Sequence, residues 1–155
     1  MERVTYDPIG EIRSPFEEPS AVPVDPDVPS GAAGRVELEP EFEPGLDGLD
    51  GFSHVTILAH LHRSPSDTLR AHPPFADGLE VGVFATASPN RPNPIAQTVV
   101  RLDSIEGTTL YVEGLDLVDG TPVLDLKPFA PKPSLLEELE TGWIGEHLDQ
   151  EYRTR

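Results

Sequence analysis

The sequence contains no cysteine, and only two of its 11 basic residues are lysines. Without a thiol it can form no disulfide framework, no thiolate metal centre and no cysteine nucleophile. No apolar run approaches the roughly 18 residues that cross a membrane. The first 13 residues, MERVTYDPIGEIR, also lack the apolar region of a signal peptide. These absences favour a water-soluble cytoplasmic protein with no membrane partner.

Helical periodicity is also scarce, whereas short β-favouring runs recur between turns. Several short strands with almost no helix predict an all-β barrel or sandwich with long Pro-rich loops. At 155 residues we expect a single domain, with its motifs in residues 9–131 and a charged tail at 132–155. No Gly-x-Gly-x-x-Gly turn precedes a helix, so nothing supports a Rossmann-type enzyme. Strands are expected at residues 9–13, 34–39, 54–62, 81–86, 96–102, 109–113 and 123–127.

Smaller elements are expected between and after these strands. Residues 69–74 read as a short edge strand, and Glu106-Gly107 as a hairpin turn. Ser134 is expected to cap a short C-terminal helix that extends to residue 139.

Alternation within two of the strands predicts which side chains share a face. In residues 54–62, Val55, Ile57, Ala59 and Leu61 alternate with a mostly polar set. In residues 123–127, Val123, Asp125 and Lys127 should share one face. There Asp125 and Lys127 either form an ordinary surface ion pair or face a binding pocket.

The charge is strongly acidic, with 28 Asp and Glu against 11 Lys and Arg and a net charge of −17. Nucleic-acid-binding proteins normally carry a basic face. In about 1 M salt, however, the Debye length falls to roughly 3 Å and repulsion from phosphates is screened. We therefore predict an archaeal-like halophilic protein that folds and binds best at high salt. The alternative is that its partner is not a nucleic acid.

Two polar turns could carry chemistry. The first, residues 87–94 (ASPNRPNP), is pre-set by three prolines and presents Arg91 with two asparagines. The second, residues 114–122 (GLDLVDGTP), contains Asp116 and a tight Asp119-Gly120 turn. Each turn is also explained by a plain connection between core strands. If they bind a ligand, both should face one cavity.

Four separate motifs, in order along the chain, resemble one family. They are IGEIRSPF and AVP (9–16 and 21–23), GFSH (51–54), GVFATASPNRPNPIAQTVVRL (82–102) and GLDLVDGTPVLDLKPF (114–129). Together they resemble the tRNA adenine-N6 methyltransferase family of the TrmO type, which uses S-adenosylmethionine (SAM). The resemblance implies a small barrel that dimerises, with SAM near the subunit interface. It also implies methylation of N6 in threonylcarbamoyl-adenosine at position 37 of tRNA, next to the anticodon.

Particular residues are candidates for roles in this reaction, some from their chemistry and some from the resemblance. Asp116, Asp119 and Asp125 are the alternatives for the group that accepts a proton from N6. Substrate contacts are implied for Arg91, Asn93 and Lys127, Arg91 because a guanidinium grips a carboxylate with two hydrogen bonds. The cofactor-lining positions implied by the resemblance are Val24, Asp25, Pro26, His62, Arg63, Ala87, Arg91, Gln97, Asp119, Gly120, Thr121 and Pro122.

Ala87 departs from the family, which usually carries arginine there, and Ala96 replaces a usual glycine. We expect Arg63 to supply the missing charge from a neighbouring strand. The loss at Ala87 also leaves open a non-catalytic barrel that binds SAM or a related nucleotide-like ligand.

A metal enzyme is a third hypothesis, because His60 and His62 have a metal-ligand spacing. No convincing third ligand accompanies them, although His72 is available. We therefore expect no metal.

Overall fold

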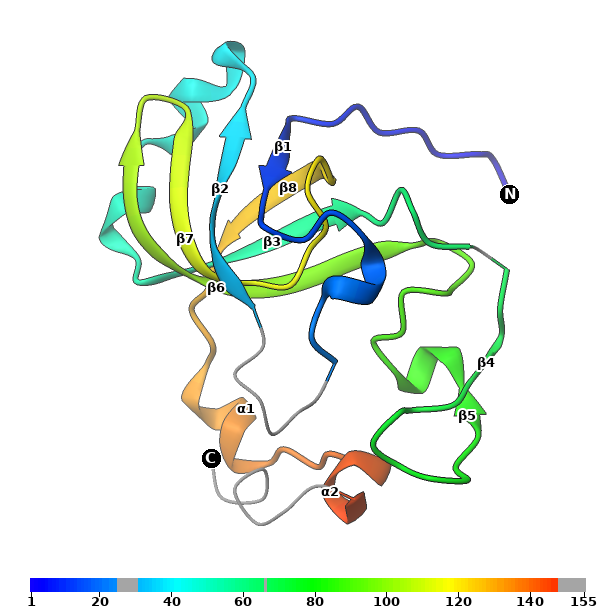
Figure 1. The fold of residues 1–155 in the computed structure, drawn as a ribbon. Coiled ribbons are helices and arrows are strands. Elements are labelled where there is room, and N and C mark those ends of the chain that lie inside the picture. Colours follow the sequence, from blue (N-terminus) through cyan, green and yellow to red (C-terminus); the bar gives the residue numbers. More distant parts are fainter. Residues whose placement is uncertain (25–30, 66, 148–155) are drawn as a thin grey trace.

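The computed structural model describes residues 1–24, 31–65 and 67–147. A closed barrel of antiparallel strands dominates the fold, in the order β1-β2-β7-β6-β3-β8 (Figure 1). Of the barrel and the sandwich that the strand pattern left open, the structure confirms the barrel, which the family resemblance also implied. The barrel strands are β1 (Gly10–Arg13), β2 (Ala32–Leu38), β3 (His54–His60), β6 (Ile95–Glu106), β7 (Thr109–Leu115) and β8 (Pro122–Pro128).

The barrel interior is filled by alternate side chains of the strands. Val55, Ile57 and Ala59 of β3 are fully buried while their neighbours are not, which confirms the predicted alternation. Each large aliphatic side chain buried in this way contributes about 1.5–3 kcal/mol of transfer free energy. The interior is therefore a packed core, and ligands must bind at an end of the barrel.

Strand β8 departs from the predicted alternation at Leu124. Its pairing with β3 shifts register, so that Leu58 lies opposite Asp125 but Ala59 lies opposite Val123. The extra residue turns Val123 toward the core on the same side as Leu126. Asp125 and Lys127 are left on the outer face. The expectation that Val123 shares their face is wrong because a β-bulge resets the period of two.

The chain between β3 and β6 leaves the barrel and forms a separate two-stranded sheet (Figure 1). This sheet contains β4 (Arg70–Ala71), which matches the predicted edge strand, and β5 (Val81–Gly82). The strand expected at 81–86 ends at Gly82, where the 3-10 turn η4 (Val83–Ala85) begins. The turn forms because both the backbone N–H and the hydroxyl of Thr86 donate to the Val83 carbonyl.

The remaining elements are short. Three 3-10 turns connect the strands: η1 (Pro19–Ala21), η2 (Pro40–Leu46) and η3 (Leu49–Gly51). Two helices follow the barrel, α1 (Pro133–Glu137) and α2 (Trp143–His147). The predicted serine cap is wrong, because Lys132 is the cap residue and Pro133 begins the helix. Among the described residues, no helix has the length and apolar character that a membrane crossing requires.

Antiparallel pairing of neighbours decides where the loops lie. The segments that follow β1, β3 and β7 leave the barrel at the same end, and β6 and β8 begin there. The two polar turns of the sequence therefore meet at this end, residues 87–94 before β6 and residues 114–122 between β7 and β8.

Candidate functional site

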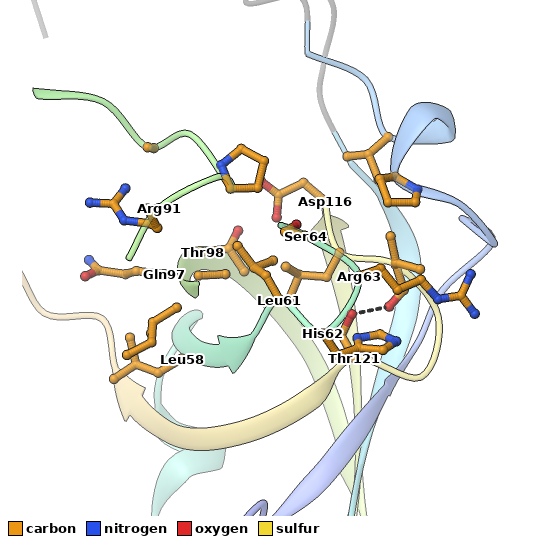
Figure 2. A pocket seen from close by; sticks show the side chains of 18 of the residues that line it. Leu58, Leu61, His62, Arg63, Ser64, Arg91, Gln97, Thr98, Asp116 and Thr121 are labelled. Atoms are coloured by element: carbon orange, nitrogen blue, oxygen red, sulfur yellow. Dashed lines mark hydrogen bonds between the residues drawn. The ribbon is translucent and has the colours of Figure 1, made fainter. Parts of the chain in front are cut away.

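A cavity of about 720 Å³ opens at this end of the barrel (Figure 2). Its volume lies in the range of small-molecule sites. Its walls come from the segment around η1, the end of β3, residues 87–94 (the proline loop) with the start of β6, and the loop before β8. The lining residues are Pro19, Val22, Pro23, Val24, Leu58, Leu61, His62, Arg63, Ser64, Thr86, Ala87, Pro89, Arg91, Asn93, Ile95, Ala96, Gln97, Thr98, Asp116, Leu117, Val118 and Thr121.

Nine of the residues expected around a ligand lie in these walls. They are Val24, His62, Arg63, Ala87, Arg91, Asn93, Gln97, Asp116 and Thr121. Asp25 and Pro26 lie outside the residues that the structure describes. Asp119, Gly120, Pro122, Asp125 and Lys127 are not among the lining residues. The two polar turns thus share one cavity, and they do so through part of the expected set of side chains.

Among the described residues that line the cavity, Asp116 is the one acidic residue. Its side chain projects into the cavity (Figure 2). It is exposed, and within the described chain no hydrogen bond or ion pair engages its carboxylate. A free carboxylate in a cavity can stabilise a cation or accept a proton. Of the three aspartates considered for this role, Asp116 alone has its side chain in the cavity wall.

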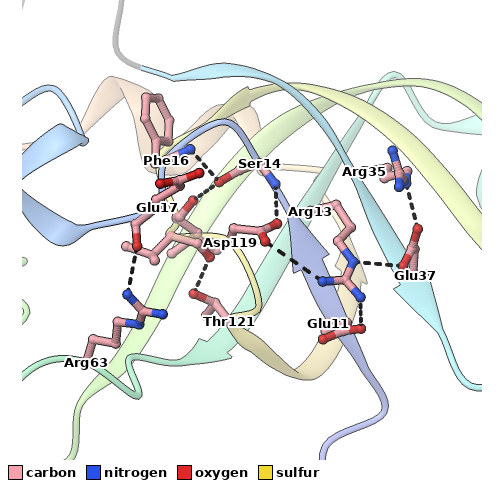
Figure 3. Close-up of polar contacts among 12 residues, drawn as sticks. Glu11, Arg13, Ser14, Phe16, Glu17, Arg35, Glu37, Arg63, Asp119 and Thr121 are labelled. Atoms are coloured by element: carbon pink, nitrogen blue, oxygen red, sulfur yellow. Dashed lines mark hydrogen bonds and ion pairs between the residues drawn. The ribbon is translucent and has the colours of Figure 1, made fainter.

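Asp119 lies on the outer side of the same loop. Its Oδ1 accepts a hydrogen bond of 3.1 Å from the Ser14 backbone N–H, and Arg13 Nη1 lies 3.9 Å from Oδ2 (Figure 3). Its own N–H donates to the Phe16 carbonyl at 2.8 Å. Asp119 therefore ties the loop to the end of β1.

Gly120 and Thr121 form the turn that closes this loop. Gly120 has φ = +73°, a conformation that favours glycine. Thr121 is 1% exposed, and its hydroxyl donates to the Val118 carbonyl at 2.6 Å. The hydroxyl thus stabilises the turn, while the side chain contributes to the floor of the cavity.

Asp125 and Lys127 pair with each other on the outer face of β8. Lys127 Nζ lies 2.5 Å from Asp125 Oδ2, and Asp125 Oδ1 also accepts from the Leu126 backbone N–H at 2.9 Å. Of the two arrangements considered from the sequence, the structure shows the surface ion pair.

Arg91 is half-buried in the cavity wall and braces its own loop. Its Nη1 donates to the Thr86 carbonyl at 2.9 Å and to the Ser88 carbonyl at 3.4 Å. Its other guanidinium nitrogens have no hydrogen-bond partner within the described part of the chain. Arg91 can therefore hold the loop and still offer donors to an anionic group.

Arg63 lines the cavity, but its guanidinium points away from it (Figure 2). Its Nη1 donates to the Glu17 carbonyl at 2.8 Å and to Glu18 Oε1 at 3.2 Å. These contacts hold the segment around η1 against the end of β3. The structure therefore gives Arg63 a bracing contact with Glu17 and Glu18.

His62 lies exposed at the rim of the cavity. Surrounding protein atoms, followed by the charges of Arg63 and His60, lower the pKa of His62 below its ordinary value. The neutral form of the imidazole is therefore favoured. Within the described residues, no three His, Asp or Glu side chains converge in a way that could hold a metal ion.

Sequence reasoning missed the apolar part of the walls, which includes Leu58 and Leu61. A signal for Leu58 was present, since it is the apolar member of the otherwise polar face of residues 54–62. Nothing in the sequence marked Leu61, which follows the apolar alternation of β3 beyond the last paired residue.

Fold and cavity together define the class: a small closed β-barrel domain with a loop-built ligand pocket at one end. The family described as tRNA-methyltransferase O N-terminal domain matches residues 11–133, and the chain belongs to this methyltransferase family. This confirms the family inferred from the motifs.

Several relatives show how far the likeness extends. A probable S-adenosyl-L-methionine-binding protein of Pyrococcus abyssi is 39% identical, over 98% of this chain and 82% of its own length. A putative S-adenosylmethionine-dependent methyltransferase of Pseudomonas aeruginosa is 43% identical over 87% of this chain and 61% of its own length. The mouse tRNA (adenine(37)-N6)-methyltransferase is 38% identical over 79% of this chain and 30% of its own length.

Solved structures agree with the fold. The crystal structure of TrmO from Pseudomonas aeruginosa superposes with a TM-score of 0.74 at 39% identity, over 92% of this chain and 63% of that one. The chain thus spans less than two thirds of the Pseudomonas and mouse relatives.

Proposed function

We propose that this protein is a SAM-dependent methyltransferase that modifies N6 of an adenosine in tRNA. The finer assignment is threonylcarbamoyl-adenosine at position 37. The observation that carries the proposal is that segments from separate family motifs build one cavity with a free carboxylate, Asp116, in its wall. The names of the relatives from Pyrococcus, Pseudomonas and mouse support both the cofactor and the nucleic acid.

The described residues fit SAM in size and in chemistry. Leu58, Leu61 and Pro89 provide apolar walls for an adenine ring. Asp116 provides a negative charge for a sulfonium cation. Arg91 has free donors for a carboxylate. The cavity therefore offers a suitable group for each part of the molecule.

When bound, SAM supplies a methyl group, whose bond to sulfur breaks as the bond to N6 forms, and S-adenosylhomocysteine leaves. The nitrogen of a carbamoylated adenosine is a weak nucleophile, so holding it in line contributes most of the rate, up to about 7–11 kcal/mol in ideal cases. Asp116 is the residue that we assign to accept the N6 proton, with an expected effect of about 10²–10⁴-fold. The braced Arg91 loop and the Asp116 loop fix the walls against which the two reactants align.

The same proposal includes the oligomeric state and the cellular location of the protein. We propose a homodimer that acts in the cytoplasm, where tRNA is found. Large exposed apolar side chains, including Phe84 at 78% exposure, support a further contact surface. The acidic surface is consistent with tRNA binding at high ionic strength, where repulsion is screened.

Calorimetric titration with SAM tests the cofactor assignment. Wild type should bind, and Asp116→Asn should lose at least about 10-fold in affinity because a charge partner of the cation is removed. Asp103→Asn is the matched control, since Asp103 pairs with Arg101 on β6. Equal affinity of Asp116→Asn and wild type would remove Asp116 from the site.

Substrate tests separate the finer statements. Transfer to tRNA bearing threonylcarbamoyl-adenosine but not to the unmodified tRNA supports the assignment at position 37. Transfer to both supports adenine N6 methylation alone. Binding of SAM without transfer to either would favour the non-catalytic barrel that Ala87 suggests.

A further inference from the structure

Helix α2 lies beyond the family-matched residues 11–133. It packs against the part of the chain between β3 and β6 that carries β4, β5 and η4, here called the excursion (Figure 1). The contact is made by Trp143, the only tryptophan in the sequence. Its Nε1 donates to the Ala85 carbonyl at 2.8 Å. Its ring stacks on Phe75, with centroids 5.4 Å apart and an angle of 23° between the planes. Trp143 thus joins the C-terminal segment to two parts of the excursion.

A short series of contacts leads from Trp143 to the cavity wall. Ala85 is followed directly by Thr86, which lines the cavity. The Thr86 carbonyl accepts the 2.9 Å hydrogen bond from Arg91, and its hydroxyl donates to the Val83 carbonyl. The position of Ala85 therefore sets the position of the carbonyl that holds Arg91.

Besides these contacts, the excursion is held by the buried side chains of Ala71, Ala76 and Val83 and by the ion pair of Arg70 with Glu80. Strands β4 and β5 have two residues each, and η4 is a single turn with Phe84 and Ala85 exposed. So short a two-stranded sheet is marginal in water. Segments with few buried contacts open at a low free-energy cost. The indole hydrogen bond at the end of η4 and the stack on Phe75 therefore add to the stability of a segment with short elements.

We propose that Trp143 is a positioning residue for the cofactor pocket: it holds η4 so that Thr86 and Arg91 are pre-arranged before a ligand binds. The inference rests on the proposed function only in naming SAM as the ligand. Pre-arrangement favours affinity because the ligand does not have to order the loop. Trp143 itself does not line the cavity.

Trp143→Phe and Trp143→Ala separate the two contacts. Phenylalanine keeps a ring against Phe75 but removes the donor to Ala85, and alanine removes both. Tyr111→Phe is the matched control, because it removes a polar group from an exposed aromatic side chain on β7.

Amide hydrogen exchange in the ligand-free protein provides the first readout. The Thr86 and Ser88 amides, bonded to the Val83 carbonyl and to Thr86 Oγ1, should exchange faster in Trp143→Phe and faster still in Trp143→Ala. Amides of β3 should be unchanged in all variants. Unchanged exchange at Thr86 and Ser88 in both tryptophan variants would overturn the inference.

SAM affinity provides the second readout. Loss of one net hydrogen bond predicts about 5-fold weaker binding for Trp143→Phe, with more for Trp143→Ala and no change for Tyr111→Phe. If Trp143 acts through Arg91, the effect of Trp143→Phe should largely disappear in an Arg91→Ala background. Additive effects in this double-mutant cycle would show that Trp143 does not act through the Arg91 loop.

The two readouts separate failure of the inference from failure of the proposed function. If wild type does not bind SAM but loop exchange still rises in the tryptophan variants, the positioning role stands and the cofactor assignment fails. If wild type binds SAM and neither loop exchange nor affinity changes in the variants, the positioning role fails and the cofactor assignment stands.

Discussion

The Ser14 backbone N–H donates a 3.1 Å hydrogen bond to Asp119 Oδ1, across 105 positions of the sequence (Figure 3). The Ser14 hydroxyl donates to the Leu117 carbonyl of the same loop at 2.6 Å. Together the two bonds attach the loop before β8 to the end of β1. Asp116 precedes Leu117 directly, so this attachment decides where the cavity carboxylate lies.

Removing the Asp119 carboxylate should weaken SAM binding even though it does not line the cavity. Asp119→Ala leaves the Ser14 N–H without its acceptor, and hydrogen bonds to charged groups contribute about 1.5–3 kcal/mol. We expect about a 10-fold loss of affinity by calorimetry. Asp50→Ala, on η3 before β3, is the control and should bind as wild type. Wild-type affinity in Asp119→Ala would show that the loop holds its place without this bond.

Arg63→Ala should weaken SAM binding through the wall around η1. The substitution removes donors to the Glu17 carbonyl and to Glu18, so Val22 and Val24 should lose their fixed distance from β3. Glu18→Gln leaves the hydrogen bond from Arg63 to the Glu17 carbonyl in place, so it should weaken SAM binding less than Arg63→Ala does. Unchanged SAM affinity in Arg63→Ala would refute both the bracing role and a compensation for Ala87.

The ion pairs around Glu37 predict a pH dependence of stability. Hydrogen bonds from Arg35 and then Arg13 lower the pKa of Glu37 below its ordinary value. A carboxyl whose pKa is lower in the folded state stabilises the fold above the unfolded-state pKa. This contribution is lost as pH falls through the folded-state pKa.

Glu37→Gln should therefore be less stable than wild type at pH 7 and equal to it at strongly acidic pH. The difference should stay below about 1 kcal/mol, since the side chain is partly exposed. Denaturant unfolding at several pH values measures it. A difference that persists at acidic pH would mean that packing, rather than charge, is responsible.

The net charge of −17 predicts that salt stabilises the protein. Repulsion among 28 carboxylates is screened as ionic strength rises. The midpoint of thermal unfolding should increase between dilute buffer and about 1 M KCl, where the Debye length is roughly 3 Å. Highest stability and strongest ligand binding in dilute buffer would contradict the halophilic interpretation.

Sequence periodicity predicted most of the barrel strands because they have one buried face, while the choice of a barrel over a sandwich came from the family resemblance. The alternation of β3 is visible in the sequence since every second residue enters the core. The β8 alternation failed because one extra residue at Leu124 leaves no mark on composition. The strand expected through Thr86 failed because a side-chain hydroxyl bonds three residues back, which favours a turn.

The two loops of the site could be predicted from the sequence, but only part of the set of side chains that line it could. The prolines and the Asp119-Gly120 turn marked two loops that line one cavity. Which aspartate enters the cavity depends on the attachment of Asp119 to Ser14, a contact between distant positions. The contacts of Trp143 with Ala85 and Phe75 were invisible for the same reason, since these two residues lie 58 positions or more away.

Methyl transfer to tRNA tests the central claim most directly. Purified protein would be incubated at high salt with methyl-labelled SAM and tRNA that carries threonylcarbamoyl-adenosine, followed by mass analysis of the anticodon-loop nucleosides. We predict label on N6 of that nucleoside with wild type and with Asp103→Asn, and a loss of at least about 100-fold in rate with Asp116→Asn. Absence of label from wild-type protein that binds SAM, or an undiminished rate in Asp116→Asn, would contradict the account.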